Sequence, residues 1–505
     1  MGKESGELSK LKLVYVLAIA GTVIKRTRDM LWKLPHQKTH ALKFQSKIII
    51  GEEIMSTAIA GVNSIPRTSP TSLTAFEDAP LRRTHVKAIA GGMGGQFTDG
   101  YIIGIIGVVL SLATESLRLT DLWIGMIAAG SLAGILCGSL LSGFIVDRIG
   151  RKSIYNLTIW IFTIGAVLQF FVTSAEQLLA LRLILGIAIG ADYAVSISMV
   201  SELAPKRLRG RIMSTVLLAW VVGFSMALII GVFLESLGEI AWRWALVSSV
   251  VPAAITLLIR AGTPESPLWL LAKGRTKEAQ QVVDKHFGDD IALPVMCASP
   301  KSAGWSKLFS RQWRRHTFVG AAFYFCQVVP FFALGTFMPK IMESIKVDNP
   351  DLGGIIYSVF LTLGASIGLW VVDKFSRRAF LIGSFYSGAV TLLVLTLWLD
   401  MPPVLVIVLF SVFALILSGA QVLEYVYLPE LFPTELRASG IGFSVAMSRI
   451  GGAGATFLLP LVITNYGVQV ALGSCVAAMV LGGVICQLFA PEPPKSLAGT
   501  AKVGH

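Results

Sequence analysis

The chain is poor in charged residues and in residues that serve metal or redox chemistry. Only 14% of its 505 residues are Asp, Glu, Lys or Arg, whereas soluble domains carry about 25%. Its five cysteines form no CxxC pair, which argues against a zinc site and a disulfide framework. The six histidines lie outside the apolar runs or at their ends, and no HExxH motif occurs. We therefore predict no metal and no cofactor.

Hydrophobic residues make up 54% of the chain, and the mean hydropathy is strongly positive. This composition predicts a polytopic membrane protein. The formal net charge of +13 allows two interpretations, nucleic-acid binding or basic loops on the cytoplasmic side of a membrane. The distribution of the basic residues supports the second interpretation. We expect the lipid bilayer, and no nucleic acid, as a partner.

Residues 1–84 differ from the rest and are predicted to be a flexible cytoplasmic extension. Residues 11–24 are apolar, but they are too few for a membrane helix, which needs about 20 residues. A basic start followed by an apolar segment is typical of a secretory signal, yet no small-residue cleavage site follows closely. From Met55 onward the segment is typical of an ordinary flexible cytoplasmic N-terminus, so we expect residues 1–54 to be an extension ahead of the functional start or a dispensable tail. A truncation starting at Met55 that lost expression or activity would contradict this hypothesis.

Twelve apolar runs follow, and each is long enough to cross a bilayer as a helix. Lysine and arginine gather in alternate connections, which places these connections and both termini in the cytoplasm of a protein of the inner cell membrane. The predicted spans are 88–112, 122–145, 154–174, 177–200, 212–234, 242–260, 317–343, 352–372, 379–399, 403–427, 438–464 and 467–490. The short basic connections hold Arg148, Arg151 and Lys152, then Lys206, Arg207, Arg209 and Arg211, and then Lys374, Arg377 and Arg378.

Two short motifs occur twice, once in each half of the chain. Residues 146–152 (VDRIGRK) recur as 372–378 (VDKFSRR), and residues 202–209 (ELAPKRLR) recur as 430–437 (ELFPTELR). The two offsets are nearly equal, which indicates an internal repeat. Parallel repeats of this kind are typical of two helix bundles that rock about a site between them. The predicted divisions are an extension at 1–84, a six-helix bundle at 85–262, a cytoplasmic linker at 263–315, a second six-helix bundle at 316–490 and a cytoplasmic tail at 491–505.

Further motifs accompany this repeat. The set comprises GFIVDRIGRKS (143–153), Arg182 with Gly186 and Gly190, SELAPKRLRG (201–210), PESPLWLLAKGR (264–275) and PELFPTELRASG (429–440). With these motifs, residues 85–490 resemble the major facilitator superfamily, in particular its sugar-porter-like and metabolite:proton symporter branches. The resemblance implies an all-α membrane protein with twelve transmembrane helices in two pseudo-symmetric six-helix bundles. The second loop motif departs from the family pattern at Ser376, where glycine is expected, so we expect a looser turn there.

The duplicated motifs carry charges at the cytoplasmic ends of the spans. In the resembled family these residues serve as gates and not as ligands of the cargo. Asp147 can pair with Arg209 or Arg211 in one conformation only, and such a pair biases a rocking equilibrium. The alternative is a set of solvated positive-inside charges with no role in coupling. The predicted gating residues are Asp147, Arg148, Arg151, Glu202, Arg209, Asp373, Arg377, Glu430 and Arg437.

Charged residues inside the predicted spans are costly there and usually face a cavity or a partner. Asp99 lies mid-span 1, Asp192 mid-span 4 and Arg449 mid-span 11, and none has a charged counterpart in the other half. A carboxyl group in a low-dielectric cavity can load and release a proton, so we predict that Asp99 and Asp192 carry the coupling proton. The alternative is a permanent ion pair with Arg182 or Arg449. Glu424 is a further acidic residue, near the inner end of span 10.

Arg449 offers a planar positive charge that suits a carboxylate or a phosphate, with a counter-ion for an aspartate as the alternative. The TDGY segment of span 1 and the GADY segment of span 4 resemble phosphate:proton and organic-acid:proton symporters. There the two aspartates, the tyrosine after the second one and a span-11 base surround the cargo, which implies Tyr193 as a ligand here. The chain departs from the phosphate branch, with arginine in place of lysine and Gln327 in place of an acidic residue. A small organic anion is therefore the expected cargo.

Other residues of spans 5 and 7 can line the same site by hydrogen bonding and stacking. Aromatic residues in spans also serve in plain helix packing, and this alternative stays open for each of them. The predicted lining residues are Gln327, Tyr324, Phe331, Phe332 and Trp220.

These residues predict a proton-coupled importer of a small anionic organic metabolite that works by alternating access as a monomer. A sugar or polyol symporter is the alternative, although only Gln327 stands where the sugar branch has a Gln-Gln pair and Asn on span 7. A drug exporter would carry a Gly-Pro-rich span 5, and this span has no proline. A non-transporting sensor is the alternative of another class, but the linker is short. An enzyme is not expected, because no nucleophile, base and orienting group combine.

Overall fold

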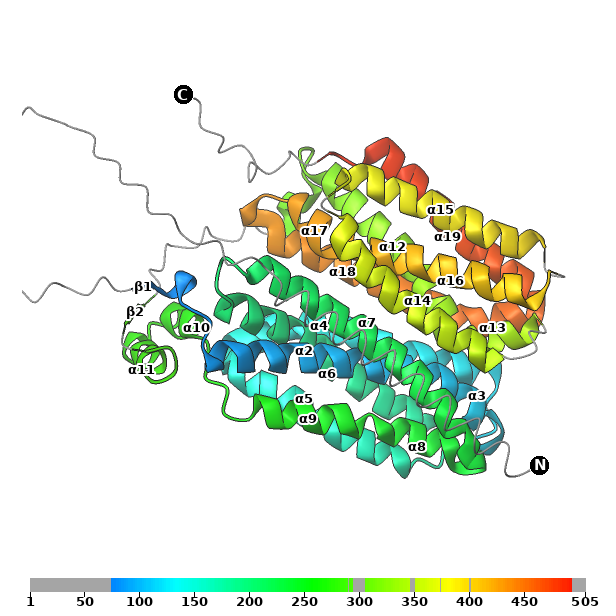
Figure 1. The fold of residues 1–505 in the computed structure, drawn as a ribbon, viewed down its shortest axis with the longest axis horizontal. Helices are drawn as coiled ribbons and strands as arrows, with labels where there is room; N and C mark the ends of the chain where they lie inside the picture. The colour runs from blue at the N-terminus through cyan, green and yellow to red at the C-terminus, as the bar shows by residue number, and fades with distance from the viewer. Residues whose placement is uncertain are drawn as a thin grey trace, which may run out of the picture. The chain divides into compact units, whose positions relative to one another are not determined.

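The computed structural model describes residues 74–288, 290–293, 305–345, 350–372, 374–398 and 401–492 (Figure 1). Most of these residues are helical. Of the predicted extension at 1–84, residues 1–73 lie outside the described residues, and so does the expected start at Met55. Of the predicted tail at 491–505, residues 493–505 lie outside them as well.

The first group of helices precedes the linker, and local sequence sets several of its ends. The Thr120 side chain accepts the Trp123 N–H at 3.4 Å and thereby caps α4. Gly150 separates α4 from α5 with a φ of 108°, which favours glycine. The elements are β1 (Thr74–Ala75), η1 (Phe76–Asp78), α2 (Arg83–Gly104), α3 (Ile106–Ser116), α4 (Asp121–Ile149), α5 (Arg151–Phe170), α6 (Ala175–Leu203), α7 (Arg209–Leu234), η2 (Glu235–Ile240), α8 (Ala241–Ser248) and α9 (Val250–Arg260).

The linker and the second group follow. Ser376, which stands where the family has glycine, begins α15 by accepting the Ala379 N–H on its side chain at 3.1 Å. The substitution thus supplies a helix cap. The linker holds α10 (Pro267–Ala272), α11 (Thr276–His286), β2 (Ile291–Ala292) and η3 (Trp305–Phe309). The second group comprises α12 (Arg314–Thr336), α13 (Met338–Ser344), α14 (Pro350–Val371), α15 (Arg377–Leu397), α16 (Pro403–Ala420), α17 (Val422–Glu430), α18 (Thr434–Tyr466) and α19 (Val468–Phe489).

The described residues contain 11 helical segments that are long and apolar enough to cross a membrane. One of them, Arg209–Arg260, has 52 residues and combines α7, η2, α8 and α9. Gly238 in η2 has non-helical backbone angles, and in Figure 1 α8 and α9 return toward the end at which α7 begins. Since one crossing needs about 20 residues, this segment crosses twice. The prediction of twelve transmembrane helices is therefore confirmed.

Most helix pairs pack within their own group, and two pairs pack extensively across the junction between the groups. In the first group α4 packs on α6 and α2 on α7, whereas in the second α12 packs on α18 and α14 on α16. Between the groups, α4 meets α18 and α7 meets α14. Gly107 of α3 faces the Thr336 carbonyl so closely that a side chain would not fit there. The candidate site lies along this junction.

The structure differs from the predicted spans at two points. The first span is longer than 88–112, because helix runs from Arg83 to Ser116 with a turn between α2 and α3. The seventh predicted span, 317–343, is two helices, since α12 ends at Thr336 and α13 begins at Met338 just before a proline. A two-residue parallel pairing, Thr74 with Ile291 and Ala75 with Ala292, is a small exception to the all-α fold.

Candidate functional site

A small cavity lies where the two groups of helices meet. Its volume is about 30 Å³, which is space for roughly one water molecule. The first group contributes residues of α6 and α7, and the second contributes residues of α12, α17 and α18. The lining residues that carry polar groups or large rings include Tyr193, Trp220, Tyr324, Glu424, Tyr425 and Arg449.

Arg449 of α18 brings a buried positive charge to this cavity. It is 8% exposed, and its guanidinium carbon lies 5.9 Å from the ring centre of Tyr193 and 6.0 Å from that of Phe332. Among the described residues it makes no hydrogen bond or ion pair, and its Nε is buried without a partner. A buried charge without a hydrogen-bonding partner is unfavourable. An anionic ligand in the cavity would remove that cost.

Phenol groups and one carboxylate form the remaining polar wall. The hydroxyls of Tyr193 and Tyr425 are hydrogen-bonded to each other and so connect the two groups of helices. The Tyr324 hydroxyl and the Glu424 carboxylate line the cavity together, and Glu424 Oε1 has no hydrogen-bond partner among the described residues. The wall therefore offers both donors and an acceptor to a ligand.

A second charged cluster lies inside the first group and is fully hydrogen-bonded. Arg260 donates from Nη1 to Asp192 Oδ1 at 2.5 Å and from Nη2 to Oδ2 at 2.9 Å, and both side chains are 0% exposed. Thr158 and Ser196 donate to the same carboxylate at 2.6 and 2.8 Å. The Arg260 guanidinium also lies 3.7 Å over the ring of Tyr155. Asp192 is thus held in an ion pair.

The partner of Asp192 is neither of the arginines that the sequence suggested. Arg182 donates instead to the Ile102 carbonyl at 2.6 Å, and Arg449 faces the cavity. Arg260 escaped sequence reasoning because it ends an apolar run, where it resembles a cytoplasmic loop charge. Its position three residues before the predicted linker gave no signal that the side chain turns back into the helices.

Asp99 of α2 is the buried carboxylate with few partners. It is 0% exposed and accepts one hydrogen bond, from Gln96 Nε2 at 3.1 Å, while its Oδ1 has none within the described ranges. Gly95, one turn earlier, lets the Asp192–Arg260 pair approach α2, since a Cβ there would lie 2.6 Å from Asp192 Oδ2. The Asp99 carboxyl group thus stands beside a fixed ion pair without being part of it.

The predicted lining residues separate into two sets. Tyr193, Tyr324, Trp220 and Phe332 line the cavity with Arg449. Gln327 and Phe331 lie outside this lining: the Gln327 side chain is buried without a described partner, and Phe331 packs on Trp220 at a ring-centre distance of 5.9 Å. Glu424 and Tyr425 of α17 join the lining. The sequence points to Glu424 only as an in-span acidic residue without an assigned role, whereas no sequence pattern indicates Tyr425.

The charged loop motifs form matching contacts in the two halves. Arg151 pairs with Glu202 in the first half, and Arg377 pairs with Glu430 at 3.8 Å in the second. These four residues occupy equivalent positions of the two repeats. Glu202 also accepts a hydrogen bond from Ser266 Oγ at 2.5 Å, which joins the linker to this contact.

The other predicted gating residues lie at the same end. Arg209 donates to the Ala204 carbonyl at 3.4 Å and Arg437 to the Pro429 carbonyl at 3.1 Å, so both bind the turn that precedes them. Arg148 is exposed in the last turn of α4. Asp147 belongs to α4, and Asp373 lies outside the described residues. The predicted contact between Asp147 and Arg209 or Arg211 stays a prediction.

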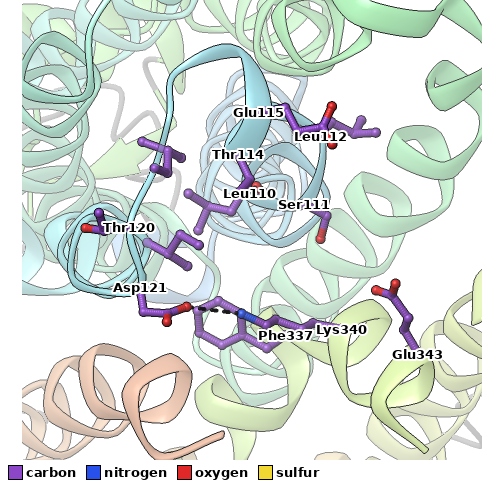
Figure 2. A pocket seen from close by; sticks show the side chains of 12 residues that line it. Leu110, Ser111, Leu112, Thr114, Glu115, Thr120, Asp121, Phe337, Lys340 and Glu343 are labelled. Carbon is purple, nitrogen blue, oxygen red and sulfur yellow. Dashed lines mark hydrogen bonds and ion pairs between the residues drawn. The ribbon is translucent and has the colours of Figure 1, made fainter. Parts of the chain in front are cut away.

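A larger pocket lies at the opposite end of the helices, with a volume of about 730 Å³. Figure 2 shows Lys340 of α13 reaching Asp121 at the start of α4, and the Nζ–Oδ1 distance is 3.5 Å. This pair joins the two groups of helices at that end. The Glu115 and Glu343 carboxylates also line the pocket, so acidic side chains outnumber basic ones.

Comparisons with known proteins agree with this architecture. The sequence model of the family described as sugar (and other) transporter matches residues 87–494. The inner membrane metabolite transport protein YgcS of Escherichia coli (strain K12) is 36% identical over 422 residues, which cover 84% of this chain and 95% of that protein. The niacin transporter NiaP of Acinetobacter baylyi is 26% identical over 410 residues, 77% of this chain and 89% of the relative.

The fold is also similar to that of a solved transporter. A partially occluded, inward-open structure of the xylose transporter XylE from E. coli has a TM-score of 0.67 at 21% identity. The similarity covers 81% of this chain and 99% of XylE. The chain therefore belongs to the sugar (and other) transporter family of the major facilitator superfamily and is a multi-pass membrane transporter of a sugar or another metabolite.

Proposed function

We propose that the protein is a proton-coupled symporter that imports a small anionic organic metabolite across the inner membrane by alternating access. The observation that carries this proposal is the position of Arg449, a buried guanidinium that lines the cavity between the halves with no hydrogen-bonding partner in the described part of the chain. A planar guanidinium binds a carboxylate with two parallel hydrogen bonds. The cargo carboxylate completes the site.

The rest of the lining suits a small organic acid with a ring or apolar body. The Tyr193, Tyr324 and Tyr425 hydroxyls can donate to the cargo or accept from it, and Trp220 and Phe332 provide ring faces. A cavity of about 30 Å³ is too small for such a cargo, so binding requires the halves to separate. The related NiaP is named as a transporter of niacin, which is itself a small aromatic carboxylate.

Asp99 carries the coupling proton in this proposal. Its carboxyl group is buried and has one hydrogen-bond donor among the described residues, so a proton can be accommodated without breaking an ion pair. Asp192 was expected to share this task. Its four hydrogen-bonded contacts to Arg260, Thr158 and Ser196 support instead the alternative of a fixed ion pair, which acts on Asp99 through its charge.

The helices at 85–262 and 316–490 are the two bodies that move, and the protein acts as a monomer. The basic loops place the termini and the linker in the cytoplasm. The equivalent pairs Arg151–Glu202 and Arg377–Glu430 then lie at the inner gate, together with Asp147, Arg148, Arg209, Asp373 and Arg437. The Asp121–Lys340 pair lies at the outer end.

A sugar or polyol symporter is the second candidate, and two observations favour it. The Glu424 carboxylate on the cavity wall would repel an anion unless it were protonated. The outer pocket carries Glu115, Asp121 and Glu343 against Lys340, and a negative entrance lowers the local concentration of anions. A neutral cargo with many hydroxyls meets neither obstacle.

Thermal-shift screening of the purified protein separates the two candidates. Carboxylates, phosphate esters and sugars are added to the wild type and to Arg449→Ala. We expect carboxylates to stabilise the wild type and to lose that effect in the variant. Stabilisation by sugars, and not by acids, would contradict the anion proposal and support the second candidate.

A further inference from the structure

A cleft of about 400 Å³ lies on the linker side of the first group, away from the cavity described above. It opens between the start of α5, the loop that precedes α10, and α11. Figure 1 shows α10 and α11 beside the end at which α2 begins. The lining side chains that carry polar or charged groups include Lys152, Glu265, Trp269, Arg275, Glu278, Lys285 and His286.

The acidic side chains of the cleft are already engaged. Glu265 accepts the backbone N–H groups of Arg151 and Lys152 at 3.1 to 3.2 Å. Glu278 accepts two hydrogen bonds from Arg275, at 2.7 and 2.5 Å. The Lys152 and Lys285 side chains make no hydrogen bond or ion pair with the described residues. Two exposed positive charges, one at the start of α5 and one near the end of α11, are thus without an ion-pair partner among the described residues.

Two further side chains with ring N–H groups, His286 and Trp269, line the cleft together with these lysines. Burial lowers the pKa of His286 below its usual 6.5, and Lys285, Lys152 and Lys87 lower it further through their positive charge. The imidazole is therefore neutral at pH 7 and offers one N–H. Trp269 also lines the cleft, is 7% exposed, and has an indole Nε1 without a hydrogen-bond partner among the described residues. The cleft offers donors of the kind that bind phosphate oxygens.

We propose that this cleft binds a phosphate-bearing anion between Lys152 and Lys285. The anion is either the phosphomonoester or diphosphate group of a soluble phosphorylated metabolite or the phosphodiester headgroup of an anionic phospholipid. The donors from α5 and α11 reach it from two sides. No part of the transport cavity contributes to this site.

The position of the cleft couples its ligand to the gate. Glu265, on its wall, holds the start of α5 through the backbone of Arg151, and the Arg151 side chain pairs with Glu202. Ser266, the next residue, donates to Glu202 at 2.5 Å. An anion that bridges Lys152 and Lys285 holds the linker against this contact. Bound anion should therefore slow transport by stabilising the conformation in which the contact is made.

Binding of inorganic pyrophosphate to the full-length protein in detergent tests the proposal by titration calorimetry at fixed ionic strength. We expect Lys285→Gln to weaken binding roughly tenfold, since it removes one of two uncompensated charges. Lys277→Gln is the matched control, because Lys277 lies on the same helix but not on the cleft. Equal weakening by both variants would mean that the anion is attracted by general surface charge and not by this cleft, and would overturn the proposal.

Nanodiscs with and without phosphatidylglycerol distinguish the two sources. A soluble ligand is indicated if pyrophosphate binds the wild type, and not Lys285→Gln, in nanodiscs of neutral lipid. A headgroup is indicated if phosphatidylglycerol raises the melting temperature of the wild type and not of Lys285→Gln. If neither probe separates Lys285→Gln from Lys277→Gln, the site does not exist. Unfolding curves of both variants without ligand show whether they are folded.

Discussion

Two charged clusters lie in the membrane interior, one in each half, and their hydrogen bonding differs. In the first half, Arg260 donates two hydrogen bonds to Asp192, and the hydroxyls of Thr158 and Ser196 donate to the same carboxylate. In the second half, Arg449 and Glu424 line a cavity, and atoms of both are left without partners in the described part of the chain. Both clusters contain buried charged groups, but only in the first cluster are these groups fully hydrogen-bonded within the described residues.

The difference separates a structural pair from a binding site. A buried pair with complete hydrogen bonds holds its helices together, and removing one partner leaves an uncompensated charge. A buried charge with free hydrogen-bonding capacity is unfavourable until a ligand arrives. We therefore infer that the first half supplies a rigid frame and the second half supplies the charge that receives the cargo.

The largest expected effect is on stability, in Arg260→Gln. This change leaves the Asp192 carboxylate buried without its cation, which should destabilise the protein by about 3–5 kcal/mol. Thermal unfolding of the purified variant measures the loss, with the exposed Arg211→Gln as control. Equal melting of the two variants would show that the pair is not structural. The double variant Asp192→Leu with Arg260→Met should recover much of the loss, because it removes both charges.

The next effect is on coupling, in Asp99→Asn. The amide cannot carry the proton, so proton-driven accumulation in vesicles should be abolished while exchange of cargo across the membrane continues. Asp78→Asn, at an exposed position before α2, is the control. Unchanged accumulation in the Asp99 variant would contradict the proton role.

For Arg449→Leu we expect a smaller loss of stability than for Arg260→Gln, or a gain. Arg449 makes no hydrogen bond or ion pair with the described residues, although Glu424 lines the same cavity, so the free energy of unfolding should fall by about 1 kcal/mol or less, or rise. Denaturant unfolding without ligand measures the change. A loss as large as that of Arg260→Gln would mean that Arg449 has a structural partner and would remove the distinction between the two clusters.

The smallest effects are expected at the loop pairs. Double-mutant cycles on Arg151 with Glu202 and on Arg377 with Glu430 should give coupling energies of roughly 0.2–1 kcal/mol, as for partly exposed pairs. The first should be larger, since Glu202 also accepts from Ser266 and its pair is less exposed. A larger coupling energy for Arg377 with Glu430 than for Arg151 with Glu202 would contradict this ranking of the two pairs.

Much of the fold follows from the sequence, because bilayer thickness and loop charge constrain it strongly. Hydropathy gave twelve crossings, and the duplicated motifs pointed to equivalent positions such as Glu202 and Glu430, which do make equivalent contacts. In-span polar residues also pointed to Arg449, Tyr193 and Tyr324, which meet at one cavity. A charge inside an apolar run is costly enough to be noticed.

The rest could not be predicted, because it depends on the direction of single side chains. Arg260 ends an apolar run, and nothing in such a run tells whether the guanidinium points to solvent or back to Asp192. Glu424 stands near a predicted span end, where the sequence likewise does not tell whether the carboxylate points to solvent or into the cavity. Gln327 and Phe331 lie on α12 like Tyr324, and only the rotation of that helix decides which of them reach the cavity.

The most direct test of the central claim is the affinity of the best-stabilising carboxylate for the wild type and for Arg449→Gln, measured by titration calorimetry on folded protein. The account predicts that the variant binds the carboxylate at least about 30-fold more weakly, the effect of removing one partner of a buried charged contact. Equal affinity in the two proteins would contradict it, because Arg449 would then not be the group that receives the cargo.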